Sequence, residues 1–255
     1  MRVVAVVSAK GGVGKTTVCA NLAVALSHEG QAVMAVDLDP QNALRYHFGI
    51  PPETLDGMSR ATLSGVDLRT ACHELPSHVV VLPYGLVNET DRQAFEDQLA
   101  GDPHWLQRRL EALELADDAI VILDTPPGPS VYLRQALTAA NIALVVTLAD
   151  AASYATLPMI EGLIDTYCVG RPGFLEYAFA INQVNRMRQL AKDVILTMQG
   201  SLGHRVVSLL HQDQSVSEAL AYNKTVIEYD PHCQGTSDFI HTARWLIETF
   251  ERHGH

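Results

Sequence analysis

Short runs of apolar residues recur along the chain and alternate with longer segments of mixed polarity. The apolar runs, almost without polar interruption, cover residues 3–7, 32–37, 78–82, 119–124, 142–148, 177–181 and 205–210. Runs of this kind are typical of strands that are buried on both faces of a sheet. Because the intervening segments are long enough for helices, the pattern predicts repeated strand–helix–strand units. We therefore expect an α/β fold with a single doubly wound, mostly parallel sheet flanked by helices, in one domain over residues 1–255.

Helical periodicity is found in several of the intervening segments. We predict helices over residues 18–26, 92–116, 153–167 and 237–252, with a break at 101–103 and shorter helical pieces near 60–63 and 68–75. In the last helix, apolar residues recur at intervals of three and four positions, at Ile240, Ala243, Ile247 and Phe250. Such a helix could lie on a membrane surface, but its acidic residues oppose binding to anionic lipids. We expect it to pack onto the sheet.

Composition and charge narrow the class of protein. The 255 residues are 47% hydrophobic and 18% charged, as in ordinary globular proteins, and the formal net charge is −11. That charge disfavours nonspecific DNA binding, which depends on a basic surface. The four cysteines are widely spaced and include no C-x-x-C pair, so we expect them to be reduced thiols. With neither a secretory leader nor an apolar run of about 20 residues, the sequence predicts a cytoplasmic protein without a membrane-spanning segment.

A glycine-rich loop follows the first apolar run and precedes the first helix. Strand, glycine loop and helix are the context in which a phosphate-binding loop works, because the loop amides and the helix start converge on one anion. We expect Lys15 to reach the β- and γ-phosphates and the Thr16 hydroxyl to bind Mg²⁺. The predicted nucleotide-binding residues are Lys10, Gly11, Gly12, Val13, Gly14, Lys15, Thr16 and Thr17.

This loop departs from the general phosphate-loop pattern, with Ala9 in place of glycine and a second lysine, Lys10, before the glycines. It resembles the loop of the deviant-Walker-A ATPases, the MinD/ParA group, which reads K-G-G-V-G-K-[ST]. The resemblance implies a P-loop NTPase that binds ATP and Mg²⁺. It also implies that Lys10 crosses to the nucleotide of a second subunit, so that ATP is enclosed in a homodimer. Without the resemblance, Lys10 would be read as a solvated loop lysine.

Acidic residues end two of the predicted strands. Asp37 and Asp39 stand at alternate positions before Pro40, and Asp124 ends the strand at 119–124. The carboxyl ends of parallel strands next to a phosphate loop are where Mg²⁺ and an attacking water are handled. By the family resemblance, Asp37 lies near the metal, Asp39 positions the hydrolytic water and Asp124 holds a Mg²⁺-bound water. The alternative for Asp37 and Asp39 is an ordinary turn.

Two later polar positions are candidates for contact with the base. An asparagine side chain can both donate to and accept from adenine, and the resemblance points to Asn182 at the end of its strand. The alternatives are that Asn185, or neither residue, makes this contact. His211 stands where relatives often have proline, and we expect it to be structural.

Short segments resemble one branch of this group, the cellulose-biosynthesis proteins called BcsQ (YhjQ). These are Leu82-Pro83-Tyr84-Gly85, Asp150-Ala151 and Val226-Ile227-Glu228-Tyr229. The resemblance implies an ATP-dependent dimerising switch with slow hydrolysis, whose partners are BcsR, BcsE and the membrane-bound cellulose synthase. Two alternatives stay open: a chromosome- or plasmid-partitioning or cell-positioning ATPase, and a scaffold that binds ATP without turnover.

Overall fold

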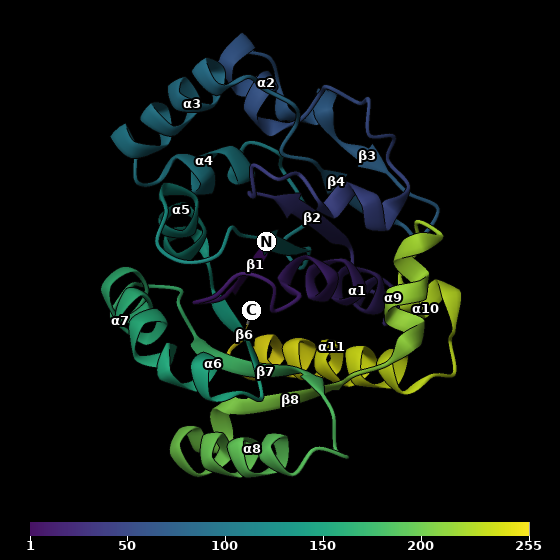
Figure 1. Ribbon diagram of the computed structural model, residues 1–255. Coiled ribbons are helices and arrows are strands. Elements are labelled where there is room, and N and C mark those ends of the chain that lie inside the picture. Colours follow the sequence, from purple (N-terminus) through teal and green to yellow (C-terminus); the bar gives the residue numbers. More distant parts are fainter. Residues whose placement is uncertain (255) are drawn as a thin grey trace.

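An eight-stranded sheet forms the centre of the molecule in the computed structural model, which describes residues 1–254 (Figure 1). The strand order is β3-β4-β2-β5-β1-β6-β7-β8, and every neighbouring pair is parallel except β3 with β4. The strands are β1 (Arg2–Val7), β2 (Val33–Asp37), β3 (His73–Glu74), β4 (Val79–Leu82), β5 (Ile120–Asp124), β6 (Ile142–Leu148), β7 (Glu176–Val184) and β8 (Val206–His211). The predicted fold class is confirmed.

Helices cover both faces of this sheet (Figure 1). One face carries α1 (Lys15–His28), α9 (Gln214–Ala221), α10 (Val226–Tyr229) and α11 (Gln234–Arg252), together with the 3-10 helix η1 (Leu44–Phe48). The other carries α2 (Met58–Ser64), α3 (Glu89–Gly101), α4 (Trp105–Glu111), α5 (Val131–Ala139), α7 (Leu157–Tyr167) and α8 (Gln189–Leu202). The short α6 (Ala151–Ala155) follows β6, while η2 (Leu68–Ala71) and η3 (Gly203–Arg205) are connecting turns.

The double covering explains why the strands read as uninterrupted apolar runs. In β1, Val4 and Val6 enter the core on the α1 side, whereas Val3, Ala5 and Val7 enter the core on the α5 side. Side chains alternate along a strand, so a sheet that is covered on both faces needs apolar residues at consecutive positions. Burial of each large aliphatic side chain contributes about 1.5–3 kcal/mol relative to exposure.

The C-terminal helix packs onto the sheet, as the sequence predicts. Phe239, Ala243, Leu246 and Phe250 of α11 are buried against the α1-side core. An ion pair between Arg244 and Glu29, with a nitrogen–oxygen distance of 3.0 Å, joins α11 to the residue that ends α1. Within residues 1–254, no helix combines the length and the apolar character required to cross a bilayer.

Several element boundaries differ from the sequence-based expectations. Residues 73–74 form the short antiparallel strand β3 rather than continuing a helix from residue 68. The helix expected over 153–167 is two helices that meet at Thr156, with Pro158 in the first turn of α7, where its missing N–H is tolerated. Helices α5, α8 and α10 were not expected from the sequence, because tertiary packing sets their bounds as much as local pattern does.

Candidate nucleotide-binding site

The loop between β1 and α1 folds into the conformation that a phosphate-binding loop requires. Gly12 and Gly14 have φ angles of 75° and 87°, in the left-handed region that favours glycine. At Gly14 a Cβ atom would also lie 2.5 Å from the Asn182 side-chain nitrogen, so a larger residue would displace the Asn182 side chain. Gly14 is the N-cap of α1, which places the positive end of the helix dipole at the loop.

Lys15 is the first residue of α1 and has only 7% of its surface exposed. Burial lowers its pKa, while the charges of Asp124 and Asp39 raise it. The ammonium group is therefore withdrawn from water at the start of the helix that follows the loop. An anionic ligand at this point would offset the loss of hydration, which is the chemistry expected for a phosphate-binding lysine.

Asp37 and Asp124 end two neighbouring parallel strands and are direct register partners. Both residues are fully buried. Burial raises the pKa of each carboxyl group, and the Asp124 charge raises that of Asp37 further. The two Asp37 oxygens accept hydrogen bonds from the backbone N–H groups of Asp39 and Leu44, at 2.9 and 3.1 Å.

The Asp124 carboxylate has a different set of partners. Its Oδ1 lies 3.5 Å from the Cys19 thiol, and its Oδ2 is buried without a hydrogen-bond partner in the described chain. Burial raises the pKa of this carboxyl group, while the neighbouring Thr16 side chain and the Lys15 ammonium lower it. Two buried carboxylates side by side fit a divalent cation, which would neutralise their repulsion. Thr16 and Asp124 would hold Mg²⁺ there, and Asp37, which is also predicted to lie near the metal, shapes the adjacent loop through its two backbone hydrogen bonds.

Asp39 begins the turn that follows β2. Its Oδ1 accepts a hydrogen bond from the backbone N–H of Gln41 at 2.9 Å, and its backbone oxygen accepts one from Asn42. Asp39 follows the end of β2 by two residues, and its charge raises the pKa of both Lys15 and Asp124. This placement fits a group that orients water at the γ-phosphate.

The turn after β5 contacts the same loop. The Gly128 backbone N–H donates to the Ser8 carbonyl at 3.0 Å, and the Thr125 hydroxyl donates to the Val6 carbonyl at 2.8 Å. A Cβ on Gly11 would lie 3.6 Å from the Pro127 ring, so the loop and the turn nearly touch. The turn at residues 125–128 is therefore packed directly against the end of β1 and the loop.

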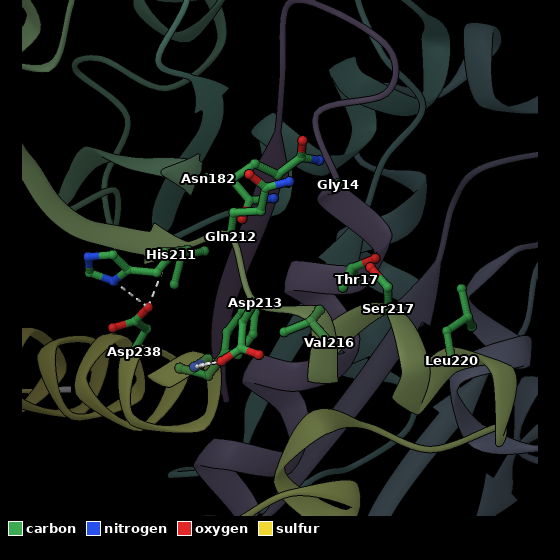
Figure 2. Close-up of a pocket in the computed structure, with 14 residues that line it drawn as sticks. Gly14, Thr17, Asn182, His211, Gln212, Asp213, Val216, Ser217, Leu220 and Asp238 are labelled. Atoms are coloured by element: carbon green, nitrogen blue, oxygen red, sulfur yellow. Dashed lines mark hydrogen bonds and ion pairs between the residues drawn. The ribbon is translucent and has the colours of Figure 1, made fainter. Parts of the chain in front are cut away.

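A cavity of about 300 Å³ lies beside the loop, between β7, β8, α9 and α11 (Figure 2). Asn182 lies in β7 at its edge, and its Nδ2 donates to the Val13 carbonyl at 2.8 Å. A contact between its Oδ1 and the base stays a prediction. Asn185 is half-buried, and its side-chain Nδ2 donates to Gln212 Oε1 at 3.1 Å. The structure thus brings Asn182, and not Asn185, into contact with the loop.

Other residues of this cavity were not found from the sequence. Val216 and Leu220 of α9 contribute apolar side chains to its lining (Figure 2), as does Phe239 of α11. These residues belong to no sequence motif. They come together only because α9 packs against the start of α11. His211 is at the cavity rim, where its backbone N–H and its Nδ1 both lie within 2.9 Å of Asp238 Oδ2. These contacts fit the structural role expected for this histidine.

Lys10 lies at the entrance of the loop. Its Nζ is 3.7 Å from Asp150 Oδ1, and both side chains remain partly exposed. Asp150 is also the N-cap of α6, since its Oδ1 accepts from the Ser153 N–H at 2.7 Å. An acidic N-cap could be read from the sequence, but the pairing with Lys10 depends on how β6 and the loop are placed in space.

Comparisons with known proteins agree with this geometry. The model of the family described as cellulose biosynthesis protein BcsQ matches residues 1–247. The Escherichia coli K12 protein BcsQ is 26% identical and the Thermus thermophilus chromosome-partitioning ATPase Soj is 30% identical, each over 97% of this chain and 94% of the relative. The Pyrococcus horikoshii septum site-determining protein MinD, solved with Mg-ADP, has a TM-score of 0.78 at 22% identity. That match covers 96% of this chain and 95% of MinD.

Proposed function

This chain belongs to the BcsQ family of cellulose biosynthesis proteins and is related to ParA- and MinD-type ATPases, and on that basis we propose that it is an ATP- and Mg²⁺-dependent dimerising switch with slow ATP hydrolysis. The observation that carries the proposal is the arrangement around Lys15. This buried ammonium starts α1 within electrostatic reach of Asp124, whose free oxygen is buried beside Asp37. A lysine and two carboxylates, all buried next to a glycine-rich loop, are the groups that a Mg²⁺-nucleotide site uses.

Each group in the site has its own part in this proposal. Backbone amides of residues 11–14 and the N-terminus of α1 bind the phosphates, and Lys15 neutralises the charge that develops on the γ-phosphoryl group. Mg²⁺ supplies further charge neutralisation when it is bound. Asp39 orients the attacking water. The Asn182 Oδ1 would accept a hydrogen bond from the adenine amine, because its Nδ2 already donates to Val13.

The proposed dimerisation rests on the family resemblance, which assigns Lys10 to the nucleotide of a second subunit. This lysine lies at the entrance of the loop and is only partly buried, so it can leave Asp150 and reach the phosphates of a second subunit. Two copies that close face to face would each supply one Lys10 to the other's nucleotide. Hydrolysis would remove the γ-phosphate that both subunits hold and would reopen the dimer.

The cellular task that we propose is a regulatory or assembly role in bacterial cellulose secretion. It rests on the BcsQ family match and on the BcsQ relatives. In this role the chain would work in the cytoplasm with BcsR-like and BcsE-like proteins, and through them at the cellulose synthase of the inner membrane. The ATP-bound dimer would be the form that these partners recognise.

A second candidate is a chromosome- or plasmid-partitioning or cell-positioning ATPase, which the 30% identity to Soj favours. Binding to nonspecific DNA at two salt concentrations separates the candidates, because cargo DNA binding would show a steep dependence on salt. A scaffold without turnover is separated by single-turnover phosphate release.

The proposed nucleotide site is tested by fluorescent-nucleotide binding in the presence of Mg²⁺. We expect wild-type protein to bind ATP and Lys15→Ala to lose at least about tenfold in affinity, because a charge-assisted contact to phosphate is removed. Thermal unfolding of the variant without nucleotide is the control for folding. Normal affinity in a folded Lys15→Ala variant would contradict the proposal.

A further inference from the structure

Cys19 lies one helical turn after Lys15 in α1 and is fully buried. Its Sγ is 3.5 Å from Asp124 Oδ1 and 3.9 Å from the Leu123 carbonyl oxygen. Both of these atoms are hydrogen-bond acceptors, so the thiol hydrogen has an acceptor at the end of β5 and the sulfur is in contact with the Asp124 carboxylate.

The two oxygens of this carboxylate are not equivalent. Oδ1 faces the Cys19 thiol, whereas Oδ2 is buried and has no hydrogen-bond partner among the described residues. A buried carboxylate oxygen without a partner carries a desolvation cost, and such an atom points to a ligand that pairs with it. Thr16, three residues before Cys19, lies on the same side of α1 and near the same carboxylate.

We propose that Cys19 is a positioning residue, which holds the Asp124 carboxylate in the rotation that offers Oδ2 to nucleotide-bound Mg²⁺. The inference rests on the proposed function, because Mg²⁺ enters the site with the nucleotide. Groups that hydrogen-bond a metal-ligating side chain fix its orientation, and their loss weakens metal binding. Here the thiol donates to one oxygen and leaves the other for the metal.

The substitutions that test this role separate the donated hydrogen from the volume of the side chain. Cys19→Ser keeps a donor at the same place, whereas Cys19→Ala removes the donor and leaves Asp124 Oδ1 without this partner. Val18→Ala is the matched control, because Val18 is the neighbouring fully buried residue of α1 and is apolar. It reports the effect of shortening a core side chain in the same helix.

The experiment measures binding of a fluorescent ADP analogue as a function of free Mg²⁺, together with binding without metal and thermal unfolding. We expect Cys19→Ala to require about tenfold more Mg²⁺, with metal-free nucleotide affinity within about twofold of wild type. Cys19→Ser should stay within about threefold of wild type in its Mg²⁺ requirement, since its hydroxyl still donates. Val18→Ala should lower thermal stability without moving the Mg²⁺ requirement.

Two results would overturn the inference. A Mg²⁺ requirement of Cys19→Ala equal to that of Val18→Ala, or lower than that of wild type, would remove the positioning role. An equal increase of the Mg²⁺ requirement in Cys19→Ser and Cys19→Ala would show that the packing of the sulfur atom, and not the donated hydrogen, orients the carboxylate. Absence of nucleotide binding by wild type would instead refute the proposed function, and the inference with it.

Discussion

The Lys10 ammonium lies 3.7 Å from the Asp150 carboxylate, within one subunit. In the proposed dimer, the same lysine contacts the nucleotide of the other subunit. We predict that the two contacts compete and that Asp150 holds Lys10 in the form without a partner. Both side chains are about one-third or more exposed, which makes the pair weak and easy to exchange.

Asp150→Asn should therefore strengthen ATP-dependent dimerisation. An exposed ion pair changes an equilibrium constant by up to about fivefold, and formation of a symmetric dimer breaks two such pairs. We therefore expect the dimer Kd of Asp150→Asn to be lower than that of wild type by up to about 25-fold. Asparagine is as good an N-cap as aspartate, so α6 should still begin at the same residue. Sedimentation at several protein concentrations measures the Kd.

The matched control for that variant is Asp118→Asn, which changes the net charge equally at an exposed position before β5. The gain in Asp150→Asn should shrink at high salt, whereas the control should not dimerise more tightly than wild type. A dimer Kd that is equal in the two variants, or weaker in Asp150→Asn, would contradict the competition.

Asp39→Ala should bind ATP but stall in the dimer. The substitution removes the carboxylate that is expected to orient the attacking water, while the loop amides and Lys15 are unchanged. Size-exclusion chromatography with ATP should show a lasting species of twice the monomer mass, and phosphate release should fall by at least about a hundredfold. A variant that binds ATP and stays monomeric would speak against the switch.

His47 should make stability dependent on pH below neutrality. This histidine of η1 is buried, and burial lowers its pKa from 6.5 to about 4. The unfolded chain therefore binds a proton between pH 6.5 and 4 that the folded chain does not, so stability present above pH 6.5 is lost as the pH falls. The loss is roughly 3 kcal/mol across that window.

Denaturant unfolding of His47→Leu at about pH 7, 5.5 and 4.5 checks this expectation, since these values span the window in which only the unfolded imidazole is protonated. The variant should lose less stability than wild type on acidification, because it has no imidazole to protonate. His204→Leu, at an exposed position, is the control and should follow wild type. Parallel pH profiles for wild type and His47→Leu would rule out the contribution of His47.

The parts of the site that local chemistry dictates could be predicted from the sequence alone. Gly12 and Gly14 have the left-handed φ angles that a glycine-rich loop suggests, and Lys15 starts the expected helix. Asp37 and Asp124 end their strands as predicted, and the sheet makes them register partners. The roles assigned to Lys10, Asp39 and Asn182 toward ATP stay predictions.

The contacts that could not be predicted join segments far apart in the chain. Cys19 meets Asp124, and Lys10 meets Asp150, only because crossover connections bring α1, β5 and β6 to one edge of the sheet. The cavity lining from α9 and α11 depends in the same way on helix packing. Local pattern can mark Lys10 and Asp124 as candidates, but it does not say which residues of distant segments lie next to them in space.

In the proposed mechanism one nucleotide is held by two subunits through Lys10, and the decisive measurement is sedimentation of wild type and Lys10→Ala with ATP. We predict that wild type dimerises with ATP and not with ADP. Lys10→Ala should bind ATP within about threefold of wild type and remain monomeric, because the lysine is needed only across the interface. Equal dimerisation of the two proteins with ATP would contradict the mechanism.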